Sequence, residues 1–379
     1  MIFEKNLKKK PVDKNFLWVT LILLAIGVLS FISASLGIYT ENPEKFWSMM
    51  LRHAGIGVIG GLLVMHFFSR INYLVWKNLS PYIYILGIIL TLLVFTGLGF
   101  EHGGARRWIS LGFISFQPAE LLKFSVIVFL SAWFARYEKN IVDWKYGILA
   151  FFVFTGIAIL TLVKQPDSGT IALIGLVSFI IYWLRGAPWK HILLTVVLGL
   201  SLIGAYVAVN PHIIERVRTF ADSSRDPYGS SWQVRQSRIA IGSGKLYGRG
   251  LGQSVHKFGS FLPESNSDSI FAIFAEEFGF VGGVILIFLY TLFGFFGLKI
   301  ARKSPSVFAQ NLVTGIILLV VIQVFFNIAA ISGLVPLSGL PLIFMSNGGT
   351  ALIVTLAQIG IILNISRHVK HRIVKTKHI

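Results

Sequence analysis

The residue of this chain best placed for chemistry is a carboxylate, Asp268, at the start of a long apolar run. It follows the polar residues Ser265, Asn266 and Ser267 and precedes the run Ile-Phe-Ala-Ile-Phe-Ala after one further serine. An acid at such a boundary can cap the helix that follows, because its side chain accepts a hydrogen bond from an N–H of the first turn. It can also serve as a general base. Its position alone favours the cap, whereas the basic segment that leads to it favours catalysis.

Three further acids lie close to apolar runs. Glu276 would be rotated from Asp268 by about 80° on one helix, so that both could face one cavity. Glu277 would then lie on the opposite face. Asp167 occupies the short turn Lys-Gln-Pro-Asp-Ser-Gly that begins at Lys164. There it is expected to cap the helix that follows, and it could contribute to a site in addition.

Cations gather in two motifs on either side of residue 110. If Pro118 begins a helix, Glu120 and Lys123 are spaced i, i+3 on one face and can neutralise each other. We therefore predict that they form a structural pair, with a ligand role for Lys123 as the alternative. Arg106 and Arg107 stand beside a tryptophan in a segment expected to be an external loop. They can extend to lipid headgroups or bind an anionic ligand.

The segment 211–267 is long and strongly basic. Its eight Lys and Arg residues outnumber its four acids. Such a segment is either a solvated loop attracted to anionic headgroups or a site for a phosphorylated ligand, because Arg and Lys are the usual binders of phosphate. The basic residues are Arg216, Arg218, Arg225, Arg235, Arg238, Lys245, Arg249 and Lys257.

Motifs for other catalytic chemistries are missing from the sequence. The chain has no cysteine, so a thiol nucleophile and a disulfide framework are excluded. It contains no Gly-x-Ser-x-Gly elbow, no His-Glu-x-x-His and no Walker-type phosphate loop. The nine histidines are scattered, and no metal site made only of protein ligands is recognisable. Any chemistry must therefore rest on carboxylates and cations.

Composition places these residues in a membrane protein. Hydrophobic residues make up 55% of the 379 and charged residues 13%, where a soluble domain carries about 25% charged residues. We therefore predict an all-α polytopic membrane protein with about ten transmembrane helices and a long extracytoplasmic loop between the seventh and the eighth. The predicted spans are Phe16–Ile38, Ala54–Phe68, Pro81–Gly97, Ala119–Phe134, Tyr146–Val163, Ser168–Leu184, His191–Asn210, Ser269–Leu298, Asn311–Gly333 and Leu340–Ile365.

The Lys and Arg residues are distributed as expected when both termini are cytoplasmic. With that orientation 20 of the 34 lie in inner segments, in agreement with the positive-inside rule. The predicted organisation is a basic cytoplasmic tail (1–15), a membrane domain (16–365) that includes the external loop 211–267, and a second basic tail (366–379). The first apolar run is too long for a signal peptide. Pro341 and the glycines at 348 and 349 are expected to interrupt the last span.

Ten short motifs follow one another along nearly the whole chain. They are Gly103-Gly-Ala-Arg-Arg-Trp-Ile, Gln117-Pro-Ala-Glu-Leu-Leu-Lys, Lys164-Gln-Pro-Asp-Ser-Gly-Thr, Tyr228-Gly-Ser-Ser-Trp-Gln-Val-Arg-Gln-Ser, Ala240-Ile-Gly-Ser-Gly, Gly248-Arg-Gly-Leu-Gly, Leu262-Pro-Glu, Asp268-Ser-Ile-Phe-Ala, Glu276-Glu-Phe-Gly-Phe-Val-Gly and Ser346-Asn-Gly-Gly-Thr. In these motifs the sequence resembles the SEDS family (shape, elongation, division and sporulation), the polytopic bacterial proteins typified by FtsW and RodA.

Two segments, the eight residues from Lys257 and the five from Asp268, are closer to the FtsW branch than to the RodA branch. Two departures from the family pattern are small. Ser-Asn-Ser precedes Asp268 where the family often has a His-Thr type pair, and Ser168 stands where Leu is common. Neither changes a charged residue of the implied site.

The resemblance implies a peptidoglycan glycosyltransferase that polymerises lipid II into glycan strands at the outer face of the bacterial cytoplasmic (inner) membrane, during cell division or elongation. Asp268 matches the family's essential aspartate and is implied as the general base, or as the group that orients the 4-hydroxyl of the acceptor GlcNAc. The charge of the leaving undecaprenyl pyrophosphate needs neutralisation. Candidates for binding it or lining the cavity are Arg106, Arg107, Lys123, Lys164, Asp167, Arg216, Arg235, Lys245 and Glu276.

The same resemblance implies partners and a cofactor. A divalent cation, Mg²⁺ or Mn²⁺, can accompany the pyrophosphate, and neither an organic cofactor nor a nucleic acid is expected. A class B penicillin-binding protein is the expected partner, together with other divisome or elongasome membrane proteins. Gly294 and Gly297, like the glycines between 279 and 283, are predicted to admit the partner's transmembrane helix, because small residues permit close helix approach in lipid. The alternative is that these glycines pack against neighbouring spans of the same chain. Two other functions stay open: a lipid II flippase, and a non-catalytic scaffold in which Asp268 only caps a helix.

Overall fold

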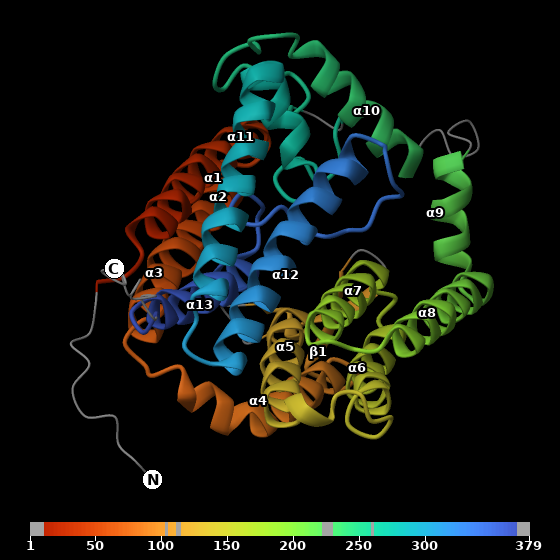
Figure 1. The fold of residues 1–379 in the computed structure, drawn as a ribbon. Helices are drawn as coiled ribbons and strands as arrows, with labels where there is room; N and C mark the ends of the chain where they lie inside the picture. The colour runs from red at the N-terminus through yellow and green to blue at the C-terminus, as the bar shows by residue number, and fades with distance from the viewer. Residues whose placement is uncertain (1–10, 103–104, 111–114, 222–229, 259–260, 370–379) are drawn as a thin grey trace.

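The computed structural model of the chain describes residues 11–102, 105–110, 115–221, 230–258 and 261–369, and nearly all of its regular structure is helical (Figure 1). The elements in order are α1 (Lys14–Glu41), α2 (Pro43–Leu51), the π-helical η1 (Arg52–Gly60), α3 (Gly61–Phe68), α4 (Leu74–Leu93), β1 (Gly99–His102), β2 (Ala105–Ser110), β3 (Ser115–Phe116), α5 (Pro118–Arg136), the short η2 (Glu138–Asn140), α6 (Ile148–Val163), α7 (Ser168–Leu184), α8 (Trp189–Val209), α9 (Pro211–Ala221), α10 (Ser230–Ser243), α11 (Ile270–Arg302), α12 (Val307–Ile331) and α13 (Gly349–Ser366). The three strands form one small antiparallel sheet in the order β1-β2-β3.

The predicted fold class and number of spans are confirmed. Eight helices of the described chain are long and apolar enough to cross a membrane, and two shorter apolar helices, α6 and α7, complete the ten. The second of the eight is the continuous run of α2, η1 and α3. The protein is therefore an all-α, multi-pass membrane protein.

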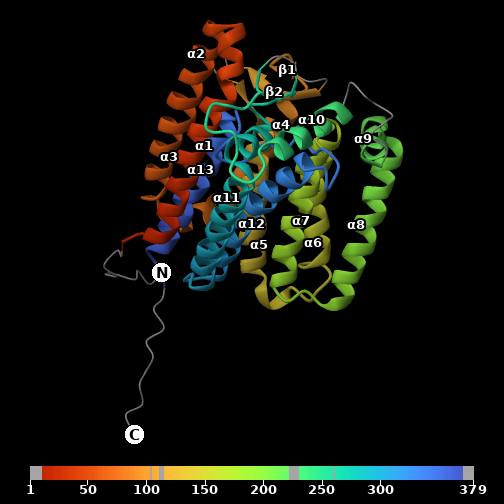
Figure 2. The same ribbon diagram turned by 90° about the horizontal axis from the view of Figure 1, so that it is seen from above.

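The spans pack side by side, and many of the connecting elements gather at one end of the bundle (Figure 2). α2, β1, β2, α9 and α10 lie at this end, whereas α1 begins and α13 ends at the opposite end. α5, α12 and α13 are the most buried spans and form the centre, while α8 is the least buried and stands at the rim. Both described ends of the chain therefore lie on one face, as an even number of spans requires.

The predicted starts of the second and third spans were wrong. The second was expected to begin at Ala54, but α2 begins earlier, because Asn42 caps it, and η1 carries the helix on into α3. The third, α4, contains Pro81, which was expected to begin it. A proline leaves the carbonyl four residues before it without a helical donor, here that of Lys77. The Ser80 hydroxyl donates to this carbonyl at 2.9 Å instead, which explains why the helix continues.

The last predicted span is interrupted as expected. α13 begins at Gly349 and not at Leu340, because residues 332–348, which we call the α12–α13 segment, are not helical. Backbone of this kind is tolerated at membrane depth only where protein covers it and supplies hydrogen bonds. The Asn327 and Gln323 amides of α12 do so, donating to the carbonyls of Leu340 and of the proline that follows it at 2.8 and 2.9 Å.

The described part of segment 211–267 is partly helical, whereas the sequence suggested a loop. It contains α9 and α10, and α10 packs against α11. In α9 the apolar and polar residues recur with helical spacing. This amphipathic pattern in the sequence could have predicted the helix. Arg225 and most of the two basic tails lie outside the described residues.

Candidate active site

Asp268 does not cap α11. The residue in the capping position is Ser269, which makes no side-chain capping hydrogen bond. Among the described residues the Asp268 carboxylate accepts one hydrogen bond, from the Ser267 hydroxyl at a long 3.4 Å. A Cβ atom placed on Gly339 would lie 3.7 Å from Asp268 Oδ2. The interpretation of Asp268 as a cap is therefore wrong, and the carboxylate retains acceptor capacity.

The backbone around Asp268 is held by the α12–α13 segment and by α12. Asn327 Nδ2 donates to the Asp268 carbonyl at 2.9 Å. The Ser346 hydroxyl donates to the carbonyl of Ser267 at 2.7 Å, and the Asn347 N–H donates to the carbonyl of Asn266 at 2.8 Å. The carbonyls of three successive residues thus accept hydrogen bonds from the protein, which fixes the backbone that carries the carboxylate.

The Asp268 carboxylate titrates near neutral pH. Burial and the neighbouring Glu264 carboxylate raise its pKa from 3.8 to about 6, against the opposing effects of the Ser267 hydroxyl and the guanidinium groups of Arg216 and Arg107. A general base works best when its pKa lies near the operating pH. Asp268 is therefore suited to accept a proton.

Two arginines and a second acid complete what we call the Asp268 group: Asp268, Asp167, Arg107 and Arg216. Arg107 donates to the carbonyls of Gln165 and of the proline that follows it at 2.9 and 2.7 Å. Burial and Arg107 lower the pKa of Arg216, whereas Asp167 and Asp268 raise it. The group is assembled from β2, the α6–α7 turn, α9 and the turn before α11, which lie far apart in the sequence.

Two residues that bond to members of this group each have a buried side-chain oxygen that no donor of the described chain reaches: Gln165 Oε1 and Asn327 Oδ1. Buried polar atoms in native proteins are nearly always satisfied, by water or a ligand where the protein does not do so. These two oxygens can therefore accept a hydrogen bond from water or from a ligand.

Lys123 and Glu120 form the predicted pair. Lys123 Nζ lies 2.9 Å from Glu120 Oε1, and both side chains are buried. Lys123 also donates to Gln323 Oε1 at 2.8 Å. Gln323 in turn donates to the carbonyl of Pro341 in the α12–α13 segment. The pair therefore supports the segment that holds the backbone at Asp268, and Lys123 makes both of its contacts with groups of the protein.

The remaining predicted site residues are divided between the Asp268 group and the rest of the molecule. Asp167 belongs to it and also caps α7 as expected, accepting from Thr170 N at 3.1 Å. The exposed side chains are those of Arg106, Lys164, Arg235 and Lys245.

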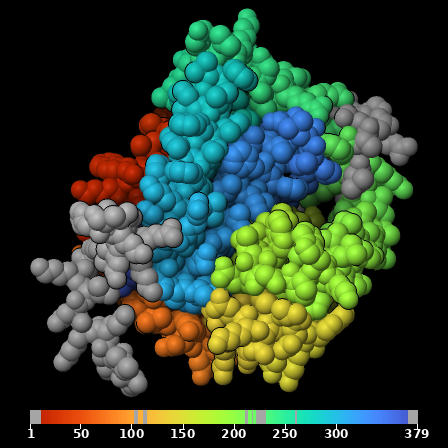
Figure 3. All heavy atoms as spheres, in the orientation of Figure 1, coloured from red at the N-terminus to blue at the C-terminus, as the bar shows by residue number. Residues whose placement is uncertain are grey.

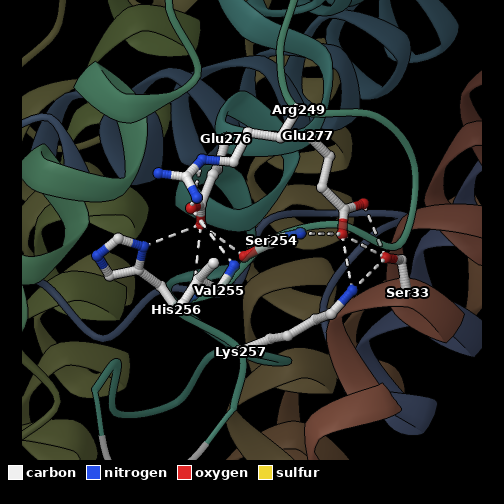
Figure 4. A network of polar contacts seen from close by, with 8 residues as sticks. All are labelled: Ser33, Arg249, Ser254, Val255, His256, Lys257, Glu276 and Glu277. Carbon is white, nitrogen blue, oxygen red and sulfur yellow. Dashed lines mark hydrogen bonds and ion pairs between the residues drawn. The ribbon is translucent and has the colours of Figure 1, made fainter.

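Glu276 was expected to face the same cavity as Asp268, but with Glu277 it instead holds residues 254–257 (Figure 4). Glu277 accepts from Lys257 Nζ at 2.9 Å and from Ser33 Oγ of α1 at 2.6 Å, and all three residues are buried. Glu276 accepts from Ser254 Oγ at 2.6 Å. Its further contacts are with Ser243, Arg249, Val255 and His256. We call this network the clasp, and it fastens the end of segment 211–267 to α1 and α11.

α11 is broken at Gly279, and residues 245–250 fill the break. Gly279 has φ 67° and ψ −166°, a backbone conformation that favours glycine. Two carbonyls and two N–H groups that would pair with each other in an unbroken helix bond to this loop instead. The bonds are Arg249 N–H to Glu276 O (3.0 Å), Gly250 N–H to Glu277 O (2.9 Å), Phe280 N–H to Lys245 O (2.9 Å) and Val281 N–H to Leu246 O (3.1 Å).

The glycines proposed for a partner helix pack inside the chain. A Cβ on Gly294 would lie 3.2 Å from the side chain of Val321, and one on Gly297 would collide with Ile317 Cδ1. Both neighbours belong to α12. The predicted partner contact at Gly294 and Gly297 is therefore wrong, and these residues serve the close approach of α11 and α12.

The polar residues of α12 and of the α12–α13 segment were missed as site residues. Gln323, Asn327 and Ser346 position the backbone beside Asp268. A signal was present, because polar side chains in an apolar span are costly and usually functional. Tyr206 and Asn210, at the end of α8, carried the same signal.

The comparisons with known proteins agree with this arrangement. A family model described as "Cell cycle protein", for FtsW, RodA and SpoVE, matches residues 14–371. The chain belongs to this family, the SEDS proteins. It is 34% identical over 368 residues to stage V sporulation protein E of Bacillus subtilis, covering 96% of this chain and 99% of that one.

A second SEDS relative and a solved structure are equally extensive matches. The chain is 35% identical over 368 residues to the probable peptidoglycan glycosyltransferase FtsW of Coxiella burnetii, covering 95% of this chain and 98% of that one. The solved structure, described as "Structural coordination of polymerization and crosslinking by a peptidoglycan synthase complex", matches with a TM-score of 0.77 and 26% identity over 95% of this chain and 99% of that one. Similar identities to sporulation and FtsW relatives leave the closer relation to FtsW a prediction.

Proposed function

We propose that this SEDS protein is a peptidoglycan glycosyltransferase that polymerises lipid II, with Asp268 as its general base. The observation that carries the proposal is the Asp268 carboxylate itself: it caps no helix, has a pKa of about 6 and is influenced by the charges of two guanidinium groups. The FtsW relative named as a probable peptidoglycan glycosyltransferase supports the reaction class.

In the proposed reaction Asp268 accepts the proton of the 4-hydroxyl of the acceptor GlcNAc while that oxygen attacks the anomeric carbon of the donor. The new glycosidic C–O bond forms as the bond from the anomeric carbon to the pyrophosphate breaks. Undecaprenyl pyrophosphate leaves with the electron pair of that bond. The reaction needs no covalent enzyme intermediate, so the lack of a nucleophile motif in the sequence is consistent with it.

Arg107 and Arg216 are proposed to stabilise the charge on the leaving pyrophosphate, because fixed cations aimed at developing charge lower the barrier. A divalent cation would fit only together with the substrate. No group of three His, Asp or Glu that could hold a metal is present in the described chain, whereas Mg²⁺ is commonly held by one or two carboxylates plus substrate phosphates. Asp268 and Asp167 would be those carboxylates, and the cation would neutralise pyrophosphate charge. Activity unchanged by a chelator would refute this part.

We propose that the end of the bundle bearing α2, α9 and α10 faces outward from the bacterial cytoplasmic membrane and that both termini are cytoplasmic. The common face of the two described chain ends and the distribution of Lys and Arg support this orientation. The site would then meet lipid II on the outer side.

A class B penicillin-binding protein is the proposed partner, with other divisome or elongasome membrane proteins around it. Support comes from the solved complex that joins polymerisation with crosslinking. With Gly294 and Gly297 buried, the partner helix would meet the outward side of α11, where large apolar side chains are exposed. These include Val284, Phe288 and Phe295.

The proposal is tested by incubating purified Asp268→Asn protein, with and without the partner, with lipid II and separating products on a gel. We expect no polymer from the variant and polymer from the native chain. A matched control is Asp143→Asn, because Asp143 is an exposed acid in the α5–α6 connection, remote in sequence from every element of the site. Polymer formation by Asp268→Asn at the native rate would refute the assignment.

A further inference from the structure

A small pocket between α9 and α10 is lined by two arginines and two hydroxyl groups. Arg216 and Thr219 line it from one face of α9, and Ser231 and Arg238 line it from one face of α10. Residues 335–337 of the α12–α13 segment form its remaining side. In Figure 3 the green surface of the α9–α10 region lies against the blue surface of α12 and the segment after it. Only Arg216 of these residues belongs to the Asp268 group.

The two hydroxyl groups have no hydrogen-bond partner. Thr219 and Ser231 are 5% and 2% exposed, and neither Thr219 Oγ1 nor Ser231 Oγ contacts a donor or acceptor in the described chain. Leaving such groups unpaired costs stability. Native proteins retain such atoms chiefly where water or a ligand completes them.

The lining carries positive charge and no carboxylate. Arg238 is fixed by donating to the carbonyls of Ser332 and Gly333 at 3.2 and 2.7 Å. Arg216 Nη1 donates a hydrogen bond to the carbonyl of Leu337 at 3.3 Å. Ser231 lies in the first turn of the fourteen-residue α10, where N–H groups have no partner within the helix and favour an anion. Arginine and hydroxyl donors around one helix start suit a tetrahedral oxyanion.

The pocket is connected to the reacting centre by direct contacts. Gln233, two residues after Ser231, donates to the hydroxyl of Ser269 at 2.9 Å, and Ser269 directly follows Asp268. Arg216 lines the pocket and also acts on the Asp268 carboxylate. A phosphoryl group held here would thus share Arg216 with the proposed general base.

We propose that this pocket binds a phosphoryl group of the lipid-linked sugar pyrophosphate through Arg216, Arg238, Thr219 and Ser231. The inference rests on the proposed function and deepens it, because it assigns the pyrophosphate of the donor to α9 and α10. An anionic phospholipid headgroup presents the same chemistry, so the experiment must separate the two sources.

The experiment measures ligand binding in the Asp268→Asn background, where no turnover occurs, from the rise in unfolding temperature of the purified protein. The probes are undecaprenyl pyrophosphate, inorganic pyrophosphate and vesicles of phosphatidylglycerol. The variants are Thr219→Val, Ser231→Ala and Arg238→Gln. Arg218→Gln is the matched control, because Arg218 is an exposed arginine of α9 outside the pocket lining.

We expect each pocket variant to bind undecaprenyl pyrophosphate about ten-fold more weakly, the effect of one lost hydrogen bond to a charged group. Without ligand, Thr219→Val should be at least as stable as its parent, because a buried unpaired hydroxyl is removed. Inorganic pyrophosphate should show the same loss, and phosphatidylglycerol and the Arg218→Gln control should show none.

Equal affinity of the pocket variants and their parent would overturn the proposal. So would a loss confined to phosphatidylglycerol, which would identify a headgroup site. The proposed function fails separately, if the native chain forms no polymer from lipid II.

Discussion

Replacing Asp268 by Asn is expected to make the protein more stable at neutral pH while it abolishes polymer formation. The folded carboxyl has a pKa of about 6 where an ordinary one has 3.8. Folding therefore favours the protonated form. The stability that protonated Asp268 contributes is present below pH 3.8 and is lost as the pH rises through about 6. Asparagine has no ionised form to bury.

The magnitude follows from this difference. A change in pKa from 3.8 to about 6 corresponds to about 3 kcal/mol. Because the Asp268 side chain is not fully enclosed, we expect about 2–3 kcal/mol at pH 7.5, falling to about 1 kcal/mol at pH 4.5. For a chain of this length that is a rise in unfolding temperature of about 2–5 °C at pH 7.5.

The assay is thermal unfolding of the purified native and Asp268→Asn proteins in one detergent, at pH 7.5 and at pH 4.5. Asp143→Asn, which changes an exposed acid, is the control and should shift neither value. A lower unfolding temperature for Asp268→Asn at pH 7.5 would refute the reasoning. A shift of the same size at both pH values would show that burial of charge is not its cause.

Three other outcomes are expected. The polymerisation rate should rise with pH through about 6, because Asp268 must be ionised to accept a proton, and Glu264→Gln should move this rise to lower pH, because Glu264 raises the Asp268 pKa; a pH-independent rate would contradict this. Lys257→Met should lower the free energy of unfolding by about 3–5 kcal/mol, because it leaves the buried Glu277 carboxylate without its cation. Adding Glu277→Gln should restore most of the lost stability, measured by chemical unfolding. If the second substitution restores nothing, the lost ion pair is not the cause of the destabilisation. Gly297→Leu should lower the yield of folded protein, because α12 occupies the space; normal yield with selective loss of the partner would restore an interface role.

The sequence predicted what depends on local pattern and missed what depends on distant contacts. Apolar runs predicted ten spans, and the spacing of Glu120 and Lys123 predicted their ion pair. The start of α4 is an exception, because its cause is local: the Ser80 hydroxyl bonds to the carbonyl that Pro81 leaves without a donor, and hydropathy does not measure such a bond. Asp268 was singled out by its position, but its environment was not foreseeable, because α12 and the α12–α13 segment hold its backbone from across the fold.

The chemical type of the site was predictable from the sequence, but which residues belong to it was not. Arg107, Asp167, Arg216 and Asp268 were all candidates, since each is an ionisable residue near an apolar run. The sequence could not distinguish them from Arg106, Arg235 or Lys245, because these residues have neighbours of the same kind in the sequence. Their separation depends on which helix face points inward, and this is set by tertiary packing.

The break at Gly279 divides α11 into two helical parts, and loop 245–250 bonds to the ends of both. In a continuous helix, inserting one residue into the lipid-facing part would rotate everything beyond it by about 100° relative to Asp268. Here the relation between the two parts also depends on loop 245–250, which donates to the carbonyls at the end of the first part and accepts from the N–H groups at the start of the second. The membrane-spanning part is therefore tied to segment 211–267 as well as to the turn that carries Asp268, so that a displacement of this part would also displace the segment.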